Sequence, residues 1–356
     1  MLRRIIKLAL SIVLALLLVV CGYITYVVIA YHRIEDDIAL AIENKSEEKI
    51  ATSTSLTIMS FNIGFGAYSV DYSFFMDGGK YSRAYSKDEV KKNVNEMIAT
   101  IDQTSPDLLL LQEVDIDATR SYHIDQAEMF ETHFTTMSST FALNYDSPYL
   151  FYPFTSPHGK SKAGLLTFAK YKIESARRYS LPIESGLRKF IDLDRCYTKQ
   201  IIKTTNDKEL VLYNLHLSAY TKDGTIATRQ LEVLFEDMKS EYALGKYIIA
   251  GGDFNKDLLQ NSGEIFGISG EDYSWAKPFP TEIIPENFSL ISGYNQENPV
   301  ASCRDTGAPY EKGKTFTITL DGFVVSSNVS VSSYEVVDAG YKNSDHNPVK
   351  MTFSLN

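Results

Sequence analysis

Polar side chains recur at the points where apolar runs of this sequence end. Glu113 follows four consecutive leucines, and Asp253 follows the apolar run at residues 248–250. The other residues placed in this way are Asn62, Gln112, Asn214, His216, Asn255, Asp321, Asp345 and His346. A strand that ends in a carboxylate, an amide or an imidazole puts that group at a sheet edge, where side chains from separate strands can meet. We therefore expect one shared site.

Each of these residues also has an ordinary structural explanation. Asp253 follows two glycines and could form a turn, and Asp345 could belong to the turn before the last strand. For any single residue the structural explanation is favoured. The recurrence of the same pattern at six strand ends favours a functional site.

The types of these residues indicate a particular chemistry. Carboxylates with an asparagine amide provide hard oxygen ligands, which suit Mg²⁺, Mn²⁺ or Ca²⁺ better than Zn²⁺. His216 and His346 could transfer protons or contact a phosphate. The combination predicts hydrolysis of a phosphoester by metal-activated water. The glycines before Asp253 lack the spacing of nucleotide-binding loops, and no serine lies in a GxSxG elbow.

Strand patterns dominate the part of the chain that carries these residues. Strands are predicted at residues 56–63, 108–111, 164–168, 210–215, 247–250, 316–320 and 349–355. Ser86 and Glu89 form a capping box that begins a helix, and a second amphipathic helix ends at Gly245. Since no repeat or low-complexity tract interrupts residues 56–356, we expect one domain, an α/β sandwich of two sheets with helices outside them.

The N-terminal region reads as a membrane anchor. Residues 5–30 are almost entirely apolar, and basic residues precede them while acidic residues follow. This predicts a single transmembrane helix with a cytoplasmic N terminus at residues 1–4 and an extracytoplasmic body at the cell membrane. Residues 31–55 are expected to form a stalk or linker, and residues 56–356 the catalytic domain. A cleaved signal peptide, or a lipid on Cys21, is a less favoured alternative.

Bulk composition excludes some classes of protein. The net charge of −10 argues against a protein that holds nucleic acid mainly by a basic face. The three cysteines, Cys21, Cys196 and Cys303, form no CxxC pair, so a zinc-thiolate site is not indicated. Two unpaired thiols are favoured over a bond between Cys196 and Cys303.

The residues at the strand ends resemble those of the endonuclease/exonuclease/phosphatase superfamily. The matching segments lie at residues 60–62, 111–114, 214–217, 252–255, 320–323 and 344–349, in the order of that superfamily. The resemblance implies a four-layer α/β/β/α fold, with two packed, mainly antiparallel β-sheets flanked by helices. Nucleases, neutral sphingomyelinases and inositol-polyphosphate phosphatases belong to this superfamily.

The resemblance also implies roles for single residues. Glu113 matches the principal metal ligand, with Asn62 beside it and Asp345 completing the metal environment. Asp253 and Asn255 match the pair that orients the attacking water and contacts the phosphate. Asp321 matches the residue that orients His346, and a neighbouring carboxylate raises the pKa of a histidine. His216 matches a second acid or phosphate ligand.

Several features leave the substrate open. Gly322 replaces an aromatic residue that is usual in the superfamily, and the loop at residues 64–79 is unusually aromatic. Arg195 could bind phosphate or form a surface ion pair, and Lys162 could flank an anionic substrate or lie in a solvated loop. The candidate substrates are nucleic acid, a phospholipid head group and an inositol phosphate. An inert binding module is the least favoured reading, and no obligate protein partner is inferred.

Overall fold

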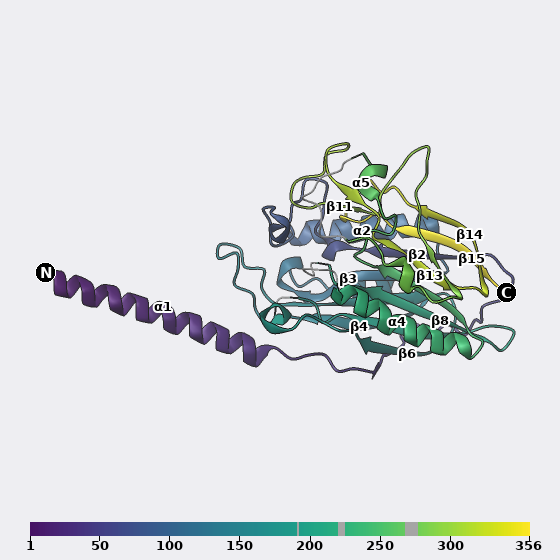
Figure 1. Cartoon of the computed structure of the whole chain (residues 1–356), viewed down its shortest axis with the longest axis horizontal. Helices are drawn as coiled ribbons and strands as arrows, with labels where there is room; N and C mark the ends of the chain where they lie inside the picture. Colours follow the sequence, from purple (N-terminus) through teal and green to yellow (C-terminus); the bar gives the residue numbers. More distant parts are fainter. Residues whose placement is uncertain (191, 220–224, 268–276) are drawn as a thin grey trace.

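The protein consists of a long N-terminal helix and a body built on two β-sheets. The computed structural model describes residues 1–190, 192–219, 225–267 and 277–356. Figure 1 shows the helix α1 (Leu2–Ala30) leaving the body at the end opposite the C terminus. The sheets and helices of the body lie together at the other end of the long axis of the molecule.

One sheet has seven strands and the other has six. The seven-stranded sheet has the order β1 (Ile38–Ala39), β6 (Ile173–Ser180), β7 (Cys196–Lys203), β8 (Glu209–His216), β9 (Tyr247–Asp253), β13 (Asp321–Ser326) and β10 (Phe288–Ile291). The six-stranded sheet has the order β14 (Val329–Val336), β15 (Val349–Leu355), β2 (Leu56–Asn62), β3 (Leu108–Ala118), β5 (Ser161–Ala169) and β4 (Ser138–Asp146). A separate pair contains β11 (Cys303–Arg304) and β12 (Thr317–Ile318).

Helices cover the outer faces of the two sheets. The α-helices of the body are α2 (Lys87–Thr104), α3 (Gln126–His133), α4 (Thr225–Ala243) and α5 (Ser262–Ile265). Short 3₁₀ helices lie at Gly64–Gly66, Phe75–Asp77, Thr119–Ser121, Gly186–Phe190 and Thr281–Ile283. Apolar residues of α2 and α3 pack on β2 and β3, while those of α4 pack on β8 and β9. A third cluster fills the space between the sheets, so the layers are helix, sheet, sheet and helix.

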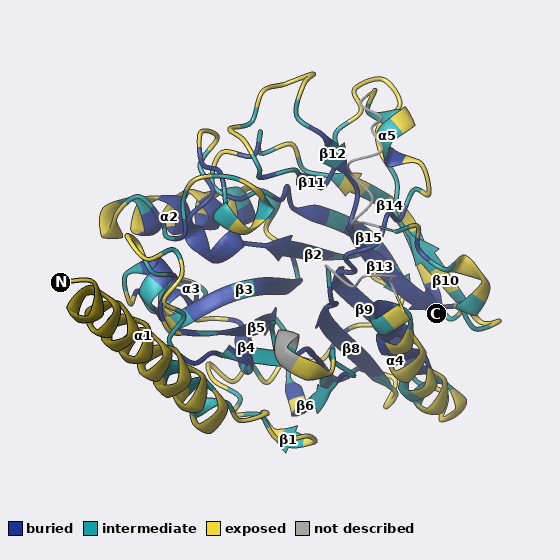
Figure 2. Ribbon diagram, turned by 60° about the vertical axis from the view of Figure 1, so that its left-hand side comes forward, coloured by how far each residue is buried: buried dark blue, intermediate teal, exposed yellow. Residues whose placement is uncertain are grey.

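Most neighbouring strands are antiparallel, as predicted, but each sheet contains a parallel pair at its centre. β2 runs parallel to β3, and β8 runs parallel to β9. These central strands are buried on both faces, which explains their continuous apolar runs (Figure 2). The predicted fold class is therefore confirmed.

The local predictions succeed where the sequence signal is strong. The Ser86 side chain accepts a hydrogen bond from the Glu89 amide at 3.1 Å, which caps the start of α2 as predicted. The strand predicted at residues 316–320 exists but is shorter than predicted. Only Thr317 and Ile318 form a short strand, and the long buried strand begins at Asp321. Gly322 and the apolar residues after it belong to this second strand, β13, which lies between β9 and β10.

The N-terminal helix is mostly exposed, whereas the segment after it packs on the body. α1 is exposed along most of its length (Figure 2), with Tyr23, Val27 and Ala30 half-buried, and it is long and apolar enough to cross a membrane, although a signal sequence would meet the same criteria of length and composition. Residues 31–55, for which we predicted a stalk, run along the body. Ile38 and Ala39 pair with β6, and Ile50 is fully buried between the sheets.

Candidate active site

The sheet topology brings the predicted residues to one edge of the body. Asn62, His216 and Asp253 are the last residues of β2, β8 and β9. Asp321 is the first residue of β13, and it lies opposite Asp253 because β13 is antiparallel to β9. Asp345 precedes β15, which is antiparallel to β2. Ends of some strands and beginnings of their antiparallel neighbours therefore meet at the same place.

A cavity of about 490 Å³ opens at this edge. The predicted site residues that line it are Glu113, Arg195, His216, Asp253, Asn255, Asp345 and His346. Asn62 and Asp321 lie behind these residues and are bonded to them. Lys162 is not among the described residues that line the cavity. It lies in β5, where its neighbours across the sheet are Asp117 and Asp146.

The side-chain amide of Asn62 joins two of the carboxylates. Its Nδ2 donates to Oε1 of Glu113 at 3.2 Å and to Oδ2 of Asp253 at 3.1 Å. Its Oδ1 accepts a hydrogen bond from the amide of Gly64 at 3.0 Å. In this arrangement Asn62 positions the acids through its nitrogen, while the oxygen that we expected beside a metal already has a backbone partner.

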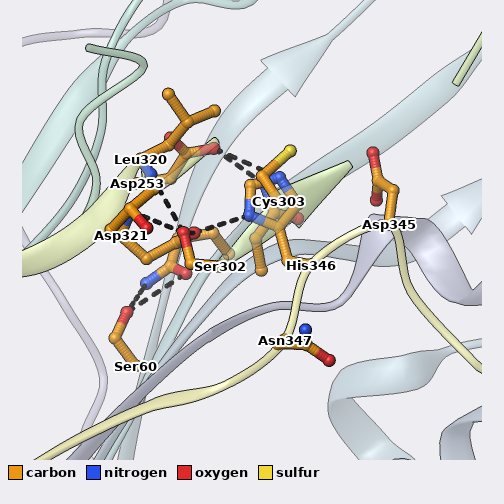
Figure 3. Close-up of polar contacts among 12 residues, drawn as sticks. Ser60, Asp253, Ser302, Cys303, Leu320, Asp321, Asp345, His346 and Asn347 are labelled. Atoms are coloured by element: carbon orange, nitrogen blue, oxygen red, sulfur yellow. Dashed lines mark hydrogen bonds and ion pairs between the residues drawn. The ribbon is translucent and has the colours of Figure 1, made fainter. Parts of the chain in front are cut away.

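His346 and Asp321 form a buried pair, shown in Figure 3. Nδ1 of His346 lies 2.7 Å from Oδ2 of Asp321, and Ser302 donates to the same oxygen at 2.7 Å. Burial opposes a charge on the imidazole, but the contact with Asp321 outweighs it and raises the pKa of His346 well above its ordinary value. The pair therefore holds an imidazolium with Nε2 turned to the cavity, 3.8 Å from Asp253.

Asp253 lies between the two histidines. Its Oδ2 is 3.5 Å from Nε2 of His216, and its Oδ1 accepts a hydrogen bond from the amide of Asn255 at 2.8 Å. Burial, with the nearby charge of Asp321, raises the pKa of Asp253 to about 7. A carboxyl group with a pKa near neutrality is suited to exchange a proton during a reaction.

His216 is neutral, in contrast to His346. Burial is the main cause of its lowered pKa, and the positive charges of Arg195 and His346 lower it further. Its Nδ1 has no hydrogen-bond partner within the part of the chain that the structure describes. A neutral imidazole can accept a proton at one nitrogen and donate from the other, so His216 can serve as a ligand for a phosphate oxygen.

The backbone near two of the acids has unusual local geometry. Glu113 has φ of +57° and lies where the register of β3 against β5 shifts, between Leu111 and Val114. Such a bulge re-aims a side chain, and here Glu113 is turned toward the cavity. Gly252, just before Asp253, has φ of +147°, and a Cβ there would lie 2.0 Å from the carbonyl oxygen of Leu215. Only glycine allows β9 to approach β8 so closely.

The residues present fit a divalent cation with oxygen ligands. Glu113 and Asp345 both line the cavity, and burial, with the charge of Glu113, raises the pKa of Asp345 to about 6. Burial disfavours the charged form of a carboxyl group, and a cation bound beside Asp345 would offset that cost and stabilise its carboxylate. Glu113 and Asp345 are the carboxylates that would hold it.

Two other groups of possible ligands occur among the described residues. One contains Asp253, Asp321 and His346, and the other contains Cys303, Asp345 and His346, with candidate atoms within 4.8 Å of one another. His346 is already bonded to Asp321 through Nδ1. Burial raises the pKa of Cys303 to about 12, so its sulfur remains a thiol and does not suit a hard cation. The set around Glu113 and Asp345 fits Mg²⁺ better.

Arg195 is the strongest candidate for binding an anion. It lines the cavity with only 4% of its surface exposed, and among the described residues its ion pair is a distant contact of 3.4 Å with Asp192. Its Nε and Nη1 have no hydrogen-bond partner in the described structure. A buried guanidinium with unused donors costs free energy, and a phosphate in the cavity would satisfy it. The alternative of a surface ion pair for Arg195 is wrong because the side chain is buried.

Sequence reasoning missed three residues that shape the site. Arg120 and Arg304 are buried and line the cavity, and Ser302 donates to Asp321. Arg120 is paired with Asp115 at 2.8 Å, and Arg304 donates to backbone oxygens of the aromatic loop. They lie on β11, in short helices or in connecting segments, where no apolar run marks a position. The two cysteines of the body, Cys196 and Cys303, are buried and unpaired.

The sequence matches one protein-family model. The model of the "Endonuclease/Exonuclease/phosphatase family" aligns with residues 59–346, a range that contains the end of β2, all of β3, β8 and β9, and every residue of the candidate site. No curated protein sequence matches the chain.

Solved structures of several proteins have a similar fold. A protein from Beutenbergia cavernae DSM 12333 described as an endonuclease/exonuclease/phosphatase has a TM-score of 0.56 at 15% identity, over 85% of this chain and 72% of that chain. D. rerio TDP2, complexed with a single strand DNA product, has a TM-score of 0.53 at 14% identity, over 85% and 100%. ANGEL2, a 2',3'-cyclic phosphatase, has a TM-score of 0.56 at 15% identity, over 89% and 99%.

Proposed function

Because the chain belongs to the endonuclease/exonuclease/phosphatase family of phosphoester hydrolases, we propose that it is a divalent-metal-dependent phosphodiesterase. The observation that carries this proposal is the placement of Asp253 between His346 and His216, in a cavity that also contains Glu113 and Asp345. This arrangement provides a proton acceptor, a proton donor and oxygen ligands around one space. These are the groups that an attack of water on phosphorus requires.

Asp253 is proposed to orient the attacking water and to take its proton. The carboxylate is held by the amide of Asn255 and by Asn62, so one oxygen keeps a fixed direction toward the cavity. Because the pKa of Asp253 is raised to about 7, the carboxylate is a stronger base than an ordinary aspartate. Asn255 itself is held by a 2.8 Å bond to the carbonyl of Leu217.

His346 is proposed to stabilise negative charge on the phosphate. Asp321 keeps the imidazole protonated and fixes its orientation through the bond to Nδ1, and at Nε2 a phosphate oxygen or the departing alcohol would replace the contact with the Cys303 thiol. His216, at the end of β8, and Arg195, just before the neighbouring β7, supply further donors to the cavity. Charge-assisted hydrogen bonds of this kind strengthen as charge develops on phosphorus.

Glu113 and Asp345 are proposed to hold the divalent metal, with Asn62 fixing Glu113. When bound, Mg²⁺, Mn²⁺ or Ca²⁺ polarises a phosphate oxygen and lowers the pKa of water. The hard oxygen set favours Mg²⁺. A positive charge here also permits Asp345 and Asp253 to remain ionised at neutral pH.

The placement of the protein is proposed to be a single-pass anchor with the catalytic domain at residues 56–356 outside the cytoplasm. The apolar helix α1 supports an anchor, and Arg3, Arg4 and Lys7 at its start support a cytoplasmic N terminus under the positive-inside rule. Digestion of intact cells with an external protease tests this orientation. Cleavage of the body in intact cells supports it, and full protection contradicts it.

The hydrolase activity is tested with bis-p-nitrophenyl phosphate, a generic phosphodiester that belongs to none of the candidate substrate classes. We expect turnover that EDTA abolishes and that added Mg²⁺ restores. Asp253→Asn should remove the activity, whereas Asp88→Asn, a change of the same type at an exposed position of α2, should not. Activity that persists in EDTA, or in Asp253→Asn, would contradict the proposed mechanism.

A further inference from the structure

A second cavity adjoins the active-site cavity on the side of α1. It has a volume of about 380 Å³ and is lined by Tyr23, Phe75, Met76, Tyr145, Leu150, Phe151, Tyr152 and His158. We call this cavity the α1 groove. Met76, Tyr145 and His158 also line the active-site cavity, so the two spaces share a wall. The groove therefore lies directly beside the active-site cavity.

One wall of the groove is the apolar helix itself. The hydroxyl of Tyr23 donates to the carbonyl oxygen of Tyr149 at 3.1 Å, and the amide of Tyr149 donates to the hydroxyl of Tyr26 at 3.0 Å. The rings of Tyr23 and Phe151 meet edge to face with their centres 5.3 Å apart. The connection between β4 and β5 is thus bonded to α1.

The segment after α1 leaves no room for a long stalk. The helix ends at Ala30, and Arg33 already forms a 3.2 Å ion pair with Asp194. The amide of Ile34 donates to the same carboxylate, and Arg178 donates to the carbonyl of Glu35 at 2.8 Å. Asp194 directly precedes Arg195 of the active site. The body is therefore held against the end of the helix.

These contacts fix the depth of the groove if α1 spans a bilayer. Lys7 is the last charged residue of the helix, and about 20 residues at ~1.5 Å each cross the ~30 Å hydrocarbon layer. The layer then ends near Val27, so Tyr23 and Tyr26 lie at its outer boundary. Tyrosine rings are typical of this interface. The groove, which contacts Tyr23, opens at the same level.

The connection between β4 and β5, beside the groove, has exposed aromatic side chains at the same depth as Tyr23. Tyr152 is 63% exposed and Phe154 is 83% exposed. Phe151 is 49% exposed, and Met76, across the groove, is 52% exposed. Large apolar side chains that gather on one loop mark a surface that binds another apolar body, and the adjacent body is the bilayer around α1.

The residues of the α1 groove do not favour binding of a nucleic-acid strand. Its described lining contains no lysine or arginine. Burial, together with the charge of Arg120, lowers the pKa of His158 to about 3, so this histidine is neutral. A track for single-stranded nucleic acid combines aromatic rings with cations that follow the phosphates. Here the aromatic rings continue into an apolar helix instead.

We propose that the substrate is a membrane phospholipid, whose head-group phosphodiester enters the active-site cavity while its apolar part stays in the α1 groove and the bilayer. The inference rests on the proposed phosphodiesterase function. The oxygen of water bonds to phosphorus, the bond from phosphorus to one ester oxygen breaks, and that oxygen takes a proton. The products are a phosphomonoester and an alcohol, one of which remains in the membrane.

The test uses the full chain in vesicles of phosphatidylcholine, phosphatidylethanolamine and phosphatidylglycerol with Mg²⁺. Conversion of the phosphodiester to a phosphomonoester, in the lipid or in the released head group, is followed by phosphorus NMR, and bis-p-nitrophenyl phosphate is assayed in the same preparation. We expect hydrolysis of at least one phospholipid. Phe154→Ser should lower that rate by at least about tenfold, because the bilayer no longer buries the ring.

Phe154 lines neither cavity, so Phe154→Ser should leave hydrolysis of the soluble diester unchanged. Leu244→Ser is the matched control. Leu244 is 72% exposed and lies just before β9, at the sheet edge opposite Asp253, so this change should leave both rates unchanged.

The remaining outcomes separate the two proposals. Metal-dependent hydrolysis of the soluble diester without hydrolysis of any phospholipid would overturn the lipid inference and keep the phosphodiesterase. Cleavage of a single-stranded oligonucleotide in preference to every phospholipid would also overturn it. If the soluble diester, the phospholipids and the oligonucleotide are all left intact, the proposed function fails, and the lipid inference fails with it.

Discussion

The active-site cavity and the α1 groove share a wall but are built from opposite kinds of residue. The cavity gathers buried acids, imidazoles and guanidinium groups, some held by specific hydrogen bonds and others, such as Arg195, with donors left unused. The groove gathers aromatic side chains, several of them exposed, on a loop and a helix. The first arrangement can polarise a phosphate, and the second can only bury apolar surface. Under the two proposals, chemistry and substrate choice reside in separate regions, and mutations in each region should affect them separately.

The largest effect is expected from Asp253→Asn. The asparagine keeps the shape of the side chain but cannot take a proton from water, so the kcat for a soluble diester should fall by about 10²- to 10⁴-fold. The free energy of unfolding should not decrease, because a buried acid that resists ionisation is replaced by a neutral amide. Steady-state kinetics and urea unfolding check the two parts. A stable variant with full activity would exclude Asp253 as the base.

A smaller effect, on the metal rather than on chemistry, is expected from Glu113→Gln. Loss of a directly ligating carboxylate should raise the Mg²⁺ concentration for half-maximal activity by more than the ~10- to 100-fold that loss of an outer partner costs. The variant should recover activity at high Mg²⁺. Glu96→Gln, which changes a carboxylate on α2 outside the cavity, is the control. An unchanged Mg²⁺ requirement would remove Glu113 from the metal site.

Arg195→Gln should weaken the phosphate contact. A hydrogen bond to a charged group contributes about 1.5–3 kcal/mol, so kcat/KM should fall by roughly tenfold to a hundredfold, with the change shared by KM and kcat. Arg177→Gln removes a half-exposed arginine that pairs with Asp37 outside the cavity and should have no effect on activity. If Arg195→Gln only reduces stability and leaves kcat/KM intact, Arg195 is structural.

The smallest effect concerns stability and pH. Burial raises the pKa of Asp253 to about 7 and that of Asp345 to about 6, above the ordinary value of 3.8. The folded protein therefore keeps protons that the unfolded chain releases between about pH 4 and 7, and metal-free stability should decline as pH rises through this range. Because a cation offsets the carboxylate charges, saturating Mg²⁺ should raise the Tm by a few degrees at pH 8 and by less at pH 5.

Thermal unfolding at several pH values, with EDTA or with Mg²⁺, measures both trends. Asp253→Asn should flatten the pH dependence of the metal-free protein. An Mg²⁺ effect that is equal at pH 5 and pH 8 would contradict the assignment of these acids to the cation.

The comparison also explains what the sequence could predict. Glu113, Asp253 and His346 were found because apolar strands mark the sheet edge, and a strand end fixes where a side chain lies. Asp321 was predicted to follow a strand, but it is the first residue of β13. The apolar pattern continues on both sides of Asp321, so the sequence does not show where one strand ends and the next begins. The site was still predicted, because β13 is antiparallel to β9 and its first residue meets the end of β9.

The arginines of the active-site cavity and the contacts of the N-terminal region could not be predicted in this way. Arg120 and Arg304 reach the cavity from short elements without periodicity, and their partners are backbone oxygens or a nearby acid. Residues 31–55 looked like a stalk because they are charged, yet they bind the body through backbone pairing and a few ion pairs, which composition does not reveal. Contacts between Tyr23 and Phe151 join segments distant in the chain, which no local pattern links.

The most direct measurement is the location of Mn²⁺ in crystals of the protein by anomalous scattering. The account predicts a peak in the active-site cavity in direct contact with the carboxylate of Glu113, on the side of Asp345, which disappears in Glu113→Gln. A peak bound instead to Cys303 and His346, or no peak in the cavity at a concentration that supports turnover, would contradict the proposed metal site.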